Sequence, residues 1–132
     1  MSIPEDVATI LDAAMSLTIG TNLFWGRGLM DTPDTQVSVQ VYGGFAPMLA
    51  MTSTVGSAVA ERPRCQIMSR AAAYATAESN AQAAWNALQN YKGTVNGTVY
   101  LNISSVQSPF WMGIDAQNRC LMGFNIDLYV QS

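Results

Sequence analysis

The chain has 132 residues and a net charge of −3, and only 11% of its residues are charged, against about 25% in ordinary globular domains. It contains no run of lysine or arginine, which excludes the basic footprint of a sequence-reading nucleic-acid-binding protein. It contains no histidine either, which excludes Ser-His-Asp and Cys-His nucleophile systems and histidine-dependent metal sites. A chain of this length is expected to form a single domain, residues 1–132, around its own core.

Two long segments carry no charge at all, residues 36–60 and residues 93–114. Monomers usually keep charge dispersed over their surface, whereas the cores of interfaces are depleted of it. The low charge therefore favours an assembly protein. A neutral surface rich in Asn, Gln, Ser and Thr is the alternative interpretation, and composition alone leaves both open.

The two cysteines, Cys65 and Cys120, lie in neither a CxxC motif nor a Cys/His cluster. Without a signal peptide, a reducing cytoplasm is the default, so two buried thiols are expected rather than a disulfide or a redox pair. The longest mostly apolar stretch, residues 48–60, is too short and too polar to span a bilayer. We expect a soluble protein with no membrane partner.

The first predicted element is a helix. Ser2 and Glu5 have the spacing of a capping box, and Pro4 is tolerated in a first turn. Apolar residues at helical spacing follow and stop near Gly20. This stripe consists of Val7, Ile10, Leu11, Ala14 and Leu17.

Strands are predicted next. Residues 22–28 (NLFWGRG) form a short strand, residues 29–35 a turn-rich connection, and residues 36–42 (QVSVQVY) a half-buried strand. In the last of these, alternation places Val37, Val39 and Val41 on one face and Gln36, Ser38 and Gln40 on the other. Residues 45–62 show no clear period and are expected to form a long loop, functional or mobile.

A third strand is predicted at residues 64–70 (RCQIMSR), followed by a second helix from residue 69 or 70 to about residue 92. An alanine-rich stripe on this helix lets another element approach closely. Glu78 is the only charge inside the helix. The stripe consists of Tyr74, Ala77, Ala81, Ala84, Trp85 and Leu88.

The last third is predicted to be β structure. Asn96 and Gly97 signal a hairpin turn, followed by a strand at residues 98–106 whose faces carry Val99, Leu101 and Ile103 against Tyr100, Asn102 and Ser104. Residues 115–118 connect a hairpin arm to the strand at 120–130, whose apolar face consists of Cys120, Met122, Phe124, Ile126, Leu128 and Val130. The order α-β-β-β-α-β-β(-β) predicts an α+β fold, a two-layer sandwich with two helices packed on a mostly antiparallel sheet of about four to six strands.

Candidate catalytic groups are few. Asp31 and Asp34 form a carboxylate pair, but they flank Thr32 and Pro33 and are ordinary turn residues there. Arg62 and Arg64 are candidates for phosphate contact, or else mark a solvated end of a strand. No GxxxxGK[ST] or GxGxxG loop is present. We therefore expect no enzyme activity, no cofactor and no metal.

Two motifs resemble a known family. Residues 63–70 (PRCQIMSR) lead into the alanine-rich helix, and residues 108–119 (SPFWMGIDAQNR) precede the terminal strand. Over residues 36–132 the chain resembles the tail-terminator or tail-completion proteins of long-tailed bacteriophages, also described as minor capsid proteins. The family patterns P-x-x-Q-I-x-x-R and P-x-x-x-G-x-D-x-x-x-R fall on Pro63, Gln66, Ile67 and Arg70, and on Pro109, Gly113, Asp115 and Arg119. Residues 45–60 match no pattern of the family.

The resemblance implies a virion protein, assembled in the host cytoplasm, that forms a homo-oligomeric ring of six subunits. The ring caps the tail tube, terminates tail polymerisation and joins the tail to the head or neck. The implied partners are other copies, the tail tube protein and a neck or head-closure protein. DNA passes through the lumen without specific binding, and the net negative charge agrees with this because phosphate binding relies on cations.

The residues expected at interfaces with other copies or partners are Trp25, Phe45, Phe110, Trp111 and Arg119. Alternation places Phe110 and Met112 on one face of the hairpin arm and Trp111 on the other, where it offers an aromatic anchor. Three alternatives stay open. The chain is a head-closure or adaptor subunit of the neck, a small-molecule-binding α+β module with a pocket of Trp25, Phe110 and Trp111, or a small hydrolase that uses Asp31 and Asp34.

Overall fold

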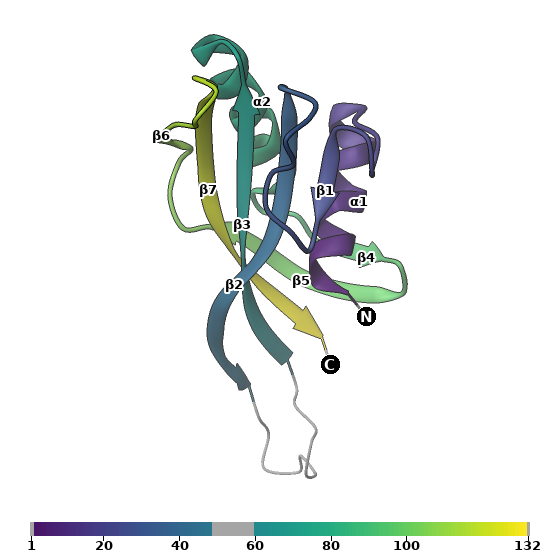
Figure 1. Ribbon diagram of the computed structural model, residues 1–132. Coiled ribbons are helices and arrows are strands. Elements are labelled where there is room, and N and C mark those ends of the chain that lie inside the picture. Colours follow the sequence, from purple (N-terminus) through teal and green to yellow (C-terminus); the bar gives the residue numbers. More distant parts are fainter. Residues whose placement is uncertain (1, 49–59, 132) are drawn as a thin grey trace.

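The computed structural model describes residues 2–48 and 60–131, and Figure 1 shows how its helices and strands are arranged. The elements are α1 (Ile3–Met15), β1 (Leu23–Trp25), β2 (Gln36–Met48), β3 (Ala60–Ala71), α2 (Tyr74–Leu88), β4 (Gly93–Val95), β5 (Thr98–Ser105), β6 (Phe110–Ile114) and β7 (Cys120–Gln131). This is the predicted order with β4 added after α2.

The strands form one sheet in the order β1-β2-β3-β7-β5-β4, and β6 pairs with β7 off this path. β1 runs parallel to β2, and every other pairing is antiparallel. Both helices pack on one face, with α2 over β3 and β7 and α1 over β1 and β2. The predicted α+β sandwich is confirmed. The described sheet has seven strands rather than four to six, because the sequence did not reveal the three-residue β4.

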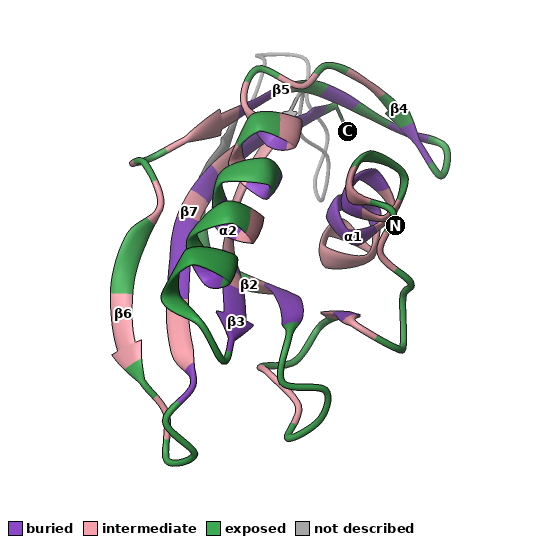
Figure 2. Cartoon of the chain, turned by 90° about the horizontal axis from the view of Figure 1, so that it is seen from above, coloured by how far each residue is buried: buried purple, intermediate pink, exposed green. Residues whose placement is uncertain are grey.

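The core lies between the helices and the sheet, and Figure 2 shows buried residues on the sides of α1 and α2 that face the strands. The alternation predicted for β7 is confirmed, because Phe124, Ile126, Leu128 and Val130 are all fully buried. α2 contributes Ala77, Ala81 and Ala84, whose small side chains let the helix approach the strands closely. Other core residues are Val7, Leu11, Val37, Val39, Ile67, Leu88 and Ile103.

One carboxylate is buried beside this core. Asp6 is 2% exposed, and it accepts hydrogen bonds from the Tyr100 hydroxyl at 2.5 Å and from Asn96 Nδ2 at 2.9 Å. Burial and the hydrogen bond to Asp6 raise the pKa of Tyr100. Because both partners come from the β4–β5 hairpin, these bonds fasten that hairpin to α1.

Both helices differ from the sequence prediction at their ends. Ser2 is the N-cap of α1 but makes no side-chain capping bond, so the predicted capping box is not formed. α2 begins at Tyr74 because β3 continues to Ala71 with Ser69 and Arg70 buried inside the strand. It ends at Leu88, four residues early, because Asn90 takes a positive φ of 62°.

The predicted faces of β2 and β5 are wrong in part. Gln36 and Ser38 are as buried as Val37 and Val39, because the connection before β2 covers this end of the strand and Gln36 bonds to the backbone of Met30 and Pro33. β1 ends at Trp25, which pairs with Val39. Val41 lies two residues further along β2 and is 54% exposed. In β5, an irregularity between Tyr100 and Asn102 shifts the register. Tyr100 and Ile103 are therefore buried, whereas Val99 and Leu101 are exposed.

The long loop predicted at residues 45–62 is shorter than expected. β2 continues to Met48 and β3 begins at Ala60, so these strands extend as an arm beyond the helices (Figure 1). Gly44 has a φ of +150°, and a Cβ there would lie 2.7 Å from the Arg62 carbonyl oxygen. The close approach of the two strands in this arm therefore requires glycine. Residues 49–59 of the predicted loop lie outside the described residues.

Replacing Gly123 with alanine is expected to destabilise the fold by about 1–3 kcal/mol. The added Cβ would lie 2.6 Å from Met112 Sδ and 2.8 Å from the Ile67 carbonyl oxygen. The methionine side chain can move, but the backbone oxygen belongs to the central strand β3. Urea denaturation measures the loss, with Gly28→Ala as the control because its Cβ would meet only the flexible end of Gln40. Equal stability of the two variants would contradict this account.

Candidate interaction surfaces

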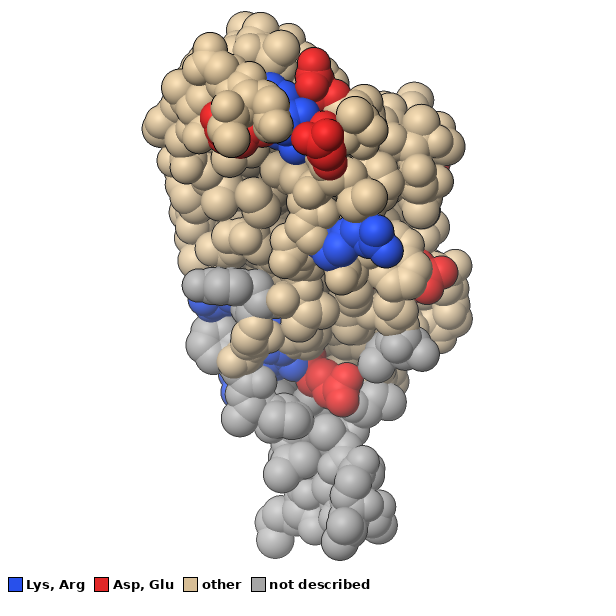
Figure 3. All heavy atoms as spheres, in the orientation of Figure 1, with Lys and Arg blue, Asp and Glu red and all other residues tan. Residues whose placement is uncertain are grey.

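Two buried arginines join the turn before β2 to the β6–β7 hairpin at one end of the sheet. Arg70 is 3% exposed and donates to three backbone carbonyls, to Pro33 at 2.7 Å, Asp34 at 3.1 Å and Asp31 at 3.3 Å. Figure 3 shows this concentration of charge at the top of the molecule. Arg70 therefore holds the turn at residues 31–34 against the end of β3.

Arg119 completes this cluster from the other side. It donates from Nε to Asp115 Oδ2 at 2.7 Å, and from Nη1 to the Asp31 carbonyl at 2.6 Å and Asp34 Oδ1 at 3.1 Å. Asp115 also accepts hydrogen bonds from the backbone of Gln117 and Arg119, which shapes the hairpin turn. The motif residues Arg70, Asp115 and Arg119 thus come together and serve the architecture of the described chain.

The charges of this cluster shift the acid–base behaviour of its members. Burial acts to raise the pKa of Asp115, but hydrogen bonds from Arg119 and Gln117 together with the Arg119 charge lower it below its ordinary value of 3.8. Burial lowers the pKa of Arg70, and the neighbouring Arg119 lowers it further. Asp115 is therefore held as a carboxylate at any pH near neutrality.

The stability of the fold is expected to decrease in acid in a way that depends on Asp115. Because the folded-state pKa of Asp115 is depressed, its contribution is complete above about pH 4 and is lost as the pH falls through the lowered pKa. Melting temperatures between about pH 5 and pH 2 should therefore fall more steeply for the wild type than for Asp115→Asn. Parallel curves would show that this carboxylate contributes nothing to the acid response.

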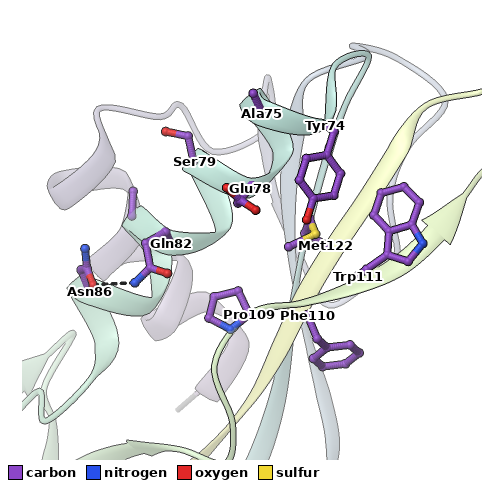
Figure 4. Close-up of a pocket in the computed structure, with 11 residues that line it drawn as sticks. Tyr74, Ala75, Glu78, Ser79, Gln82, Asn86, Pro109, Phe110, Trp111 and Met122 are labelled. Atoms are coloured by element: carbon purple, nitrogen blue, oxygen red, sulfur yellow. Dashed lines mark hydrogen bonds between the residues drawn. The ribbon is translucent and has the colours of Figure 1, made fainter.

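On the side of the sheet that carries the helices, α2 and β6 enclose a groove of about 590 Å³ (Figure 4). The rings of Tyr74 and Trp111 lie at its rim with their centroids 5.3 Å apart, and the two residues are 48% and 45% exposed. The Tyr74 hydroxyl is hydrogen-bonded to Glu78, which raises the pKa of Tyr74. The other lining residues are Ala75, Ser79, Gln82, Ala83, Asn86, Pro109, Phe110 and Met122. This α2–β6 groove is aromatic at one end and polar but nearly uncharged along the helix.

A second hollow lies at β1, on the opposite edge of the sheet. Trp25 is 37% exposed there, and Arg27 is exposed with its Nη1 at 3.5 Å from Met30 Sδ. The remaining lining residues are Ile19, Gly20, Leu23, Phe24 and Gly26. The structure therefore does not assemble the predicted pocket of Trp25, Phe110 and Trp111, because the sheet order separates β1 from β6 by three strands.

The residues predicted at interfaces take up different positions. Trp111 faces the helices and Phe110 lies on the opposite face of β6, as alternation predicted (Figure 4). Arg119 is 6% exposed and bound within the chain. The backbone of Phe45 pairs with Arg62 in the arm, and its side chain lies outside the described part of the structure. The contribution of these residues to interfaces stays a prediction.

The catalytic alternatives gain no support from the geometry. The carboxylates of Asp31 and Asp34 are paired with Arg119 at 3.7 and 3.1 Å, which favours the turn interpretation. Arg64 pairs with Asp127 at 2.6 Å. Among the described residues, no group of three or more His, Cys, Asp or Glu is placed to hold a metal. Nor is any described helix long and apolar enough to cross a membrane.

The cysteines are too far apart to form a pair. Cys65 lies opposite Ile126, whereas Cys120 lies opposite Ala71, six residues further along β3. This separation is about 20 Å along the strand, far beyond the reach of a disulfide. Burial also raises the pKa of Cys65 to about 12, so its thiol stays protonated. Both cysteines are free in the structure; the prediction of buried thiols is confirmed for Cys65, whereas Cys120 is only partly buried.

A helix-covered sheet with exposed aromatic residues at both edges is typical of a protein that contacts other proteins. Comparison with known families agrees with this class. The family model for "Bacteriophage tail terminator protein" matches residues 25–131, and the chain therefore belongs to the bacteriophage tail terminator family. It is a structural component of a virion.

Among solved structures, the chain is similar to one from the virion of a native gene transfer agent particle. The two share 15% sequence identity with a TM-score of 0.66, over 99% of this chain and 96% of the other. At this identity the likeness shows the fold. No curated protein matches the sequence significantly.

Proposed function

We propose that copies of this chain form a ring of six that caps the tail tube, ends its polymerisation and joins the tail to the head or neck. Membership of the tail terminator family supports this proposal. The observation in the structure that carries it is the exposure of large apolar side chains on opposite edges of the sheet, at Trp25 on β1 and at Trp111 and Ile114 on β6. Such patches mark contact surfaces when they are rimmed by polar residues.

The proposed role requires no catalysis. It requires a lateral contact between subunits, one surface that matches the tube and another that matches the neck. The low charge of the chain suits such extensive contacts, because interface cores are depleted of charge. The arginine cluster joins the turn at residues 31–34, the end of β3 and the β6–β7 hairpin, which supplies rigidity at one end of the sheet and holds the surfaces around it in a fixed relation.

The experiment that tests this function is polymerisation of the tail tube protein with and without the purified chain. A terminator halts growth, so tubes measured by electron microscopy should become shorter and more uniform as the chain is added. A head-closure or adaptor subunit would leave tube length unchanged. Tubes of unaltered length would therefore contradict the terminator role and favour the neck alternative.

We also expect the chain to have no appreciable affinity for duplex DNA at about physiological salt. The net charge of the chain is −3. Two of the arginines, Arg70 and Arg119, are buried in contacts within the chain. A filter-binding or fluorescence-anisotropy titration measures the affinity. Tight binding would contradict a lumen through which DNA slides freely.

A further inference from the structure

The two exposed edges of the sheet, β1 and β6, lie at the same level. The strand register connects them residue by residue, because each pairing continues into the next across β2, β3 and β7. One such row consists of Leu23, Val37, Ser69, Met122 and Trp111, and the next of Phe24, Ser38, Met68, Gly123 and Phe110. A neighbouring copy placed beside this one by a rotation would therefore bring its β1 edge up to this copy's β6 edge.

The two edges are complementary in charge and shape. The β1 edge projects Trp25 with the cation Arg27 two residues further along the chain, and both are exposed. The β6 edge offers the α2–β6 groove, with Tyr74 and Trp111 at its rim and Glu78 as the only acidic residue in its lining. An indole packed against the Tyr74–Trp111 ring pair, with a guanidinium near a carboxylate, satisfies both surfaces.

We infer that the β1 edge of one copy docks into the α2–β6 groove of a second copy, with Trp25 as the anchor. Because the two surfaces differ, the contact is heterologous, and each open oligomer keeps one free surface of each kind until the ring closes. The inference deepens the ring proposed above and rests on it. It assigns the lateral contact to two particular edges.

The contact is made through side chains rather than by adding a strand. At the outer side of β1, Ile19 bridges Leu23, and the Gly20 N–H donates to the Leu23 carbonyl at 2.8 Å. The backbone of this edge is therefore partly occupied. A single aromatic anchor buries about 150–250 Å², whereas a stable interface buries about 800 Å² on each partner. Flanking residues such as Phe24 and the polar face of α2 must contribute the remainder.

The decisive test mixes two variants, Trp25→Ala and Trp111→Ala. Each variant alone has one of the two surfaces weakened, so neither should assemble at concentrations at which the wild type does. The mixture contains one intact β1 edge and one intact groove, so native mass spectrometry should show 1:1 dimers and nothing larger. A mixture that stays monomeric, or a Trp25→Ala chain that assembles like the wild type, would overturn the inference. The wild type is measured beside them, alone and with tail tube protein.

A charge reversal tests the same contact without removing an aromatic ring. Arg27→Glu and Glu78→Arg should each weaken assembly about tenfold, and the double variant should recover most of the loss because the pair is reversed. No recovery would overturn the inference even if one single variant folded poorly.

The wild type separates failure of this inference from failure of the proposed function. Wild-type chain that remains monomeric, even with tube protein, contradicts both. Wild-type chain that assembles while all four single variants assemble equally well overturns only the assignment of edges. Variants that form rings but no longer bind tubes would assign the groove to the tube protein instead.

Discussion

Replacing Arg70 with methionine is expected to destabilise the fold by on the order of 3 kcal/mol. Methionine keeps the apolar stem but removes the three hydrogen bonds that Arg70 donates to the carbonyls of Asp31, Pro33 and Asp34. The Asp31 and Pro33 carbonyls keep their bonds from Arg119 and Gln36. Those acceptors lie against a residue that is 3% exposed, where water replaces the lost bonds poorly. The melting temperature should fall by about 10 °C for a domain of this size.

The matched control for this experiment is Arg27→Met, the same chemical change at an exposed position. Surface substitutions of this kind usually change stability by less than about 0.5 kcal/mol. Guanidinium chloride denaturation of both variants compares them directly. Similar stabilities would show that the arginine cluster does not hold the turn at residues 31–34, and that the family motif has another purpose in this chain.

The second large effect is expected at Trp111, and it concerns assembly rather than folding. Trp111→Ala should weaken self-association about 30-fold, the effect of a hot-spot side chain worth about 2 kcal/mol. Its ring is 45% exposed and contacts Tyr74 at the rim of the groove, so the helix-covered core remains intact. Sedimentation velocity measures the association, and thermal denaturation of the monomer measures the fold.

Trp111→Phe is the matched variant, because it keeps an aromatic ring against Tyr74 and should recover much of the association. A Trp111→Ala chain that unfolds outright would show that the residue belongs to the core. A chain that assembles normally would exclude Trp111 from the interface. Either result contradicts the role of this side chain as an anchor.

Sequence patterns were most accurate for elements whose buried face is set by packing against a single neighbouring layer. The terminal strand β7 packs one face against the helices along its whole length, and its alternation survives intact from Met122 to Val130. β2 does not follow its pattern because the connection that precedes it folds back over the face that carries Gln36 and Ser38. In β5 a single register shift after Tyr100 buries Tyr100 and Ile103 and leaves Val99 and Leu101 exposed. Local periodicity contains neither effect.

The candidate surfaces were predicted in part for a similar reason. Exposed tryptophans and low charge identified the aromatic residues, but nothing in the sequence showed that Trp25 and Trp111 lie on opposite edges. The arginines of the two motifs were also open to several roles. The available signal was the presence of Asp31 and Asp34 in the sequence, because a buried arginine needs hydrogen-bond acceptors. Only the topology brings those residues together.

The measurement that tests the central claim most directly is an electron micrograph of tail tubes assembled in the presence of this chain carrying a gold label. The account predicts one ring of label at a single end of each tube, with growth stopped at that end. Label scattered along the tube wall, or tubes whose ends remain bare while they continue to grow, would contradict it.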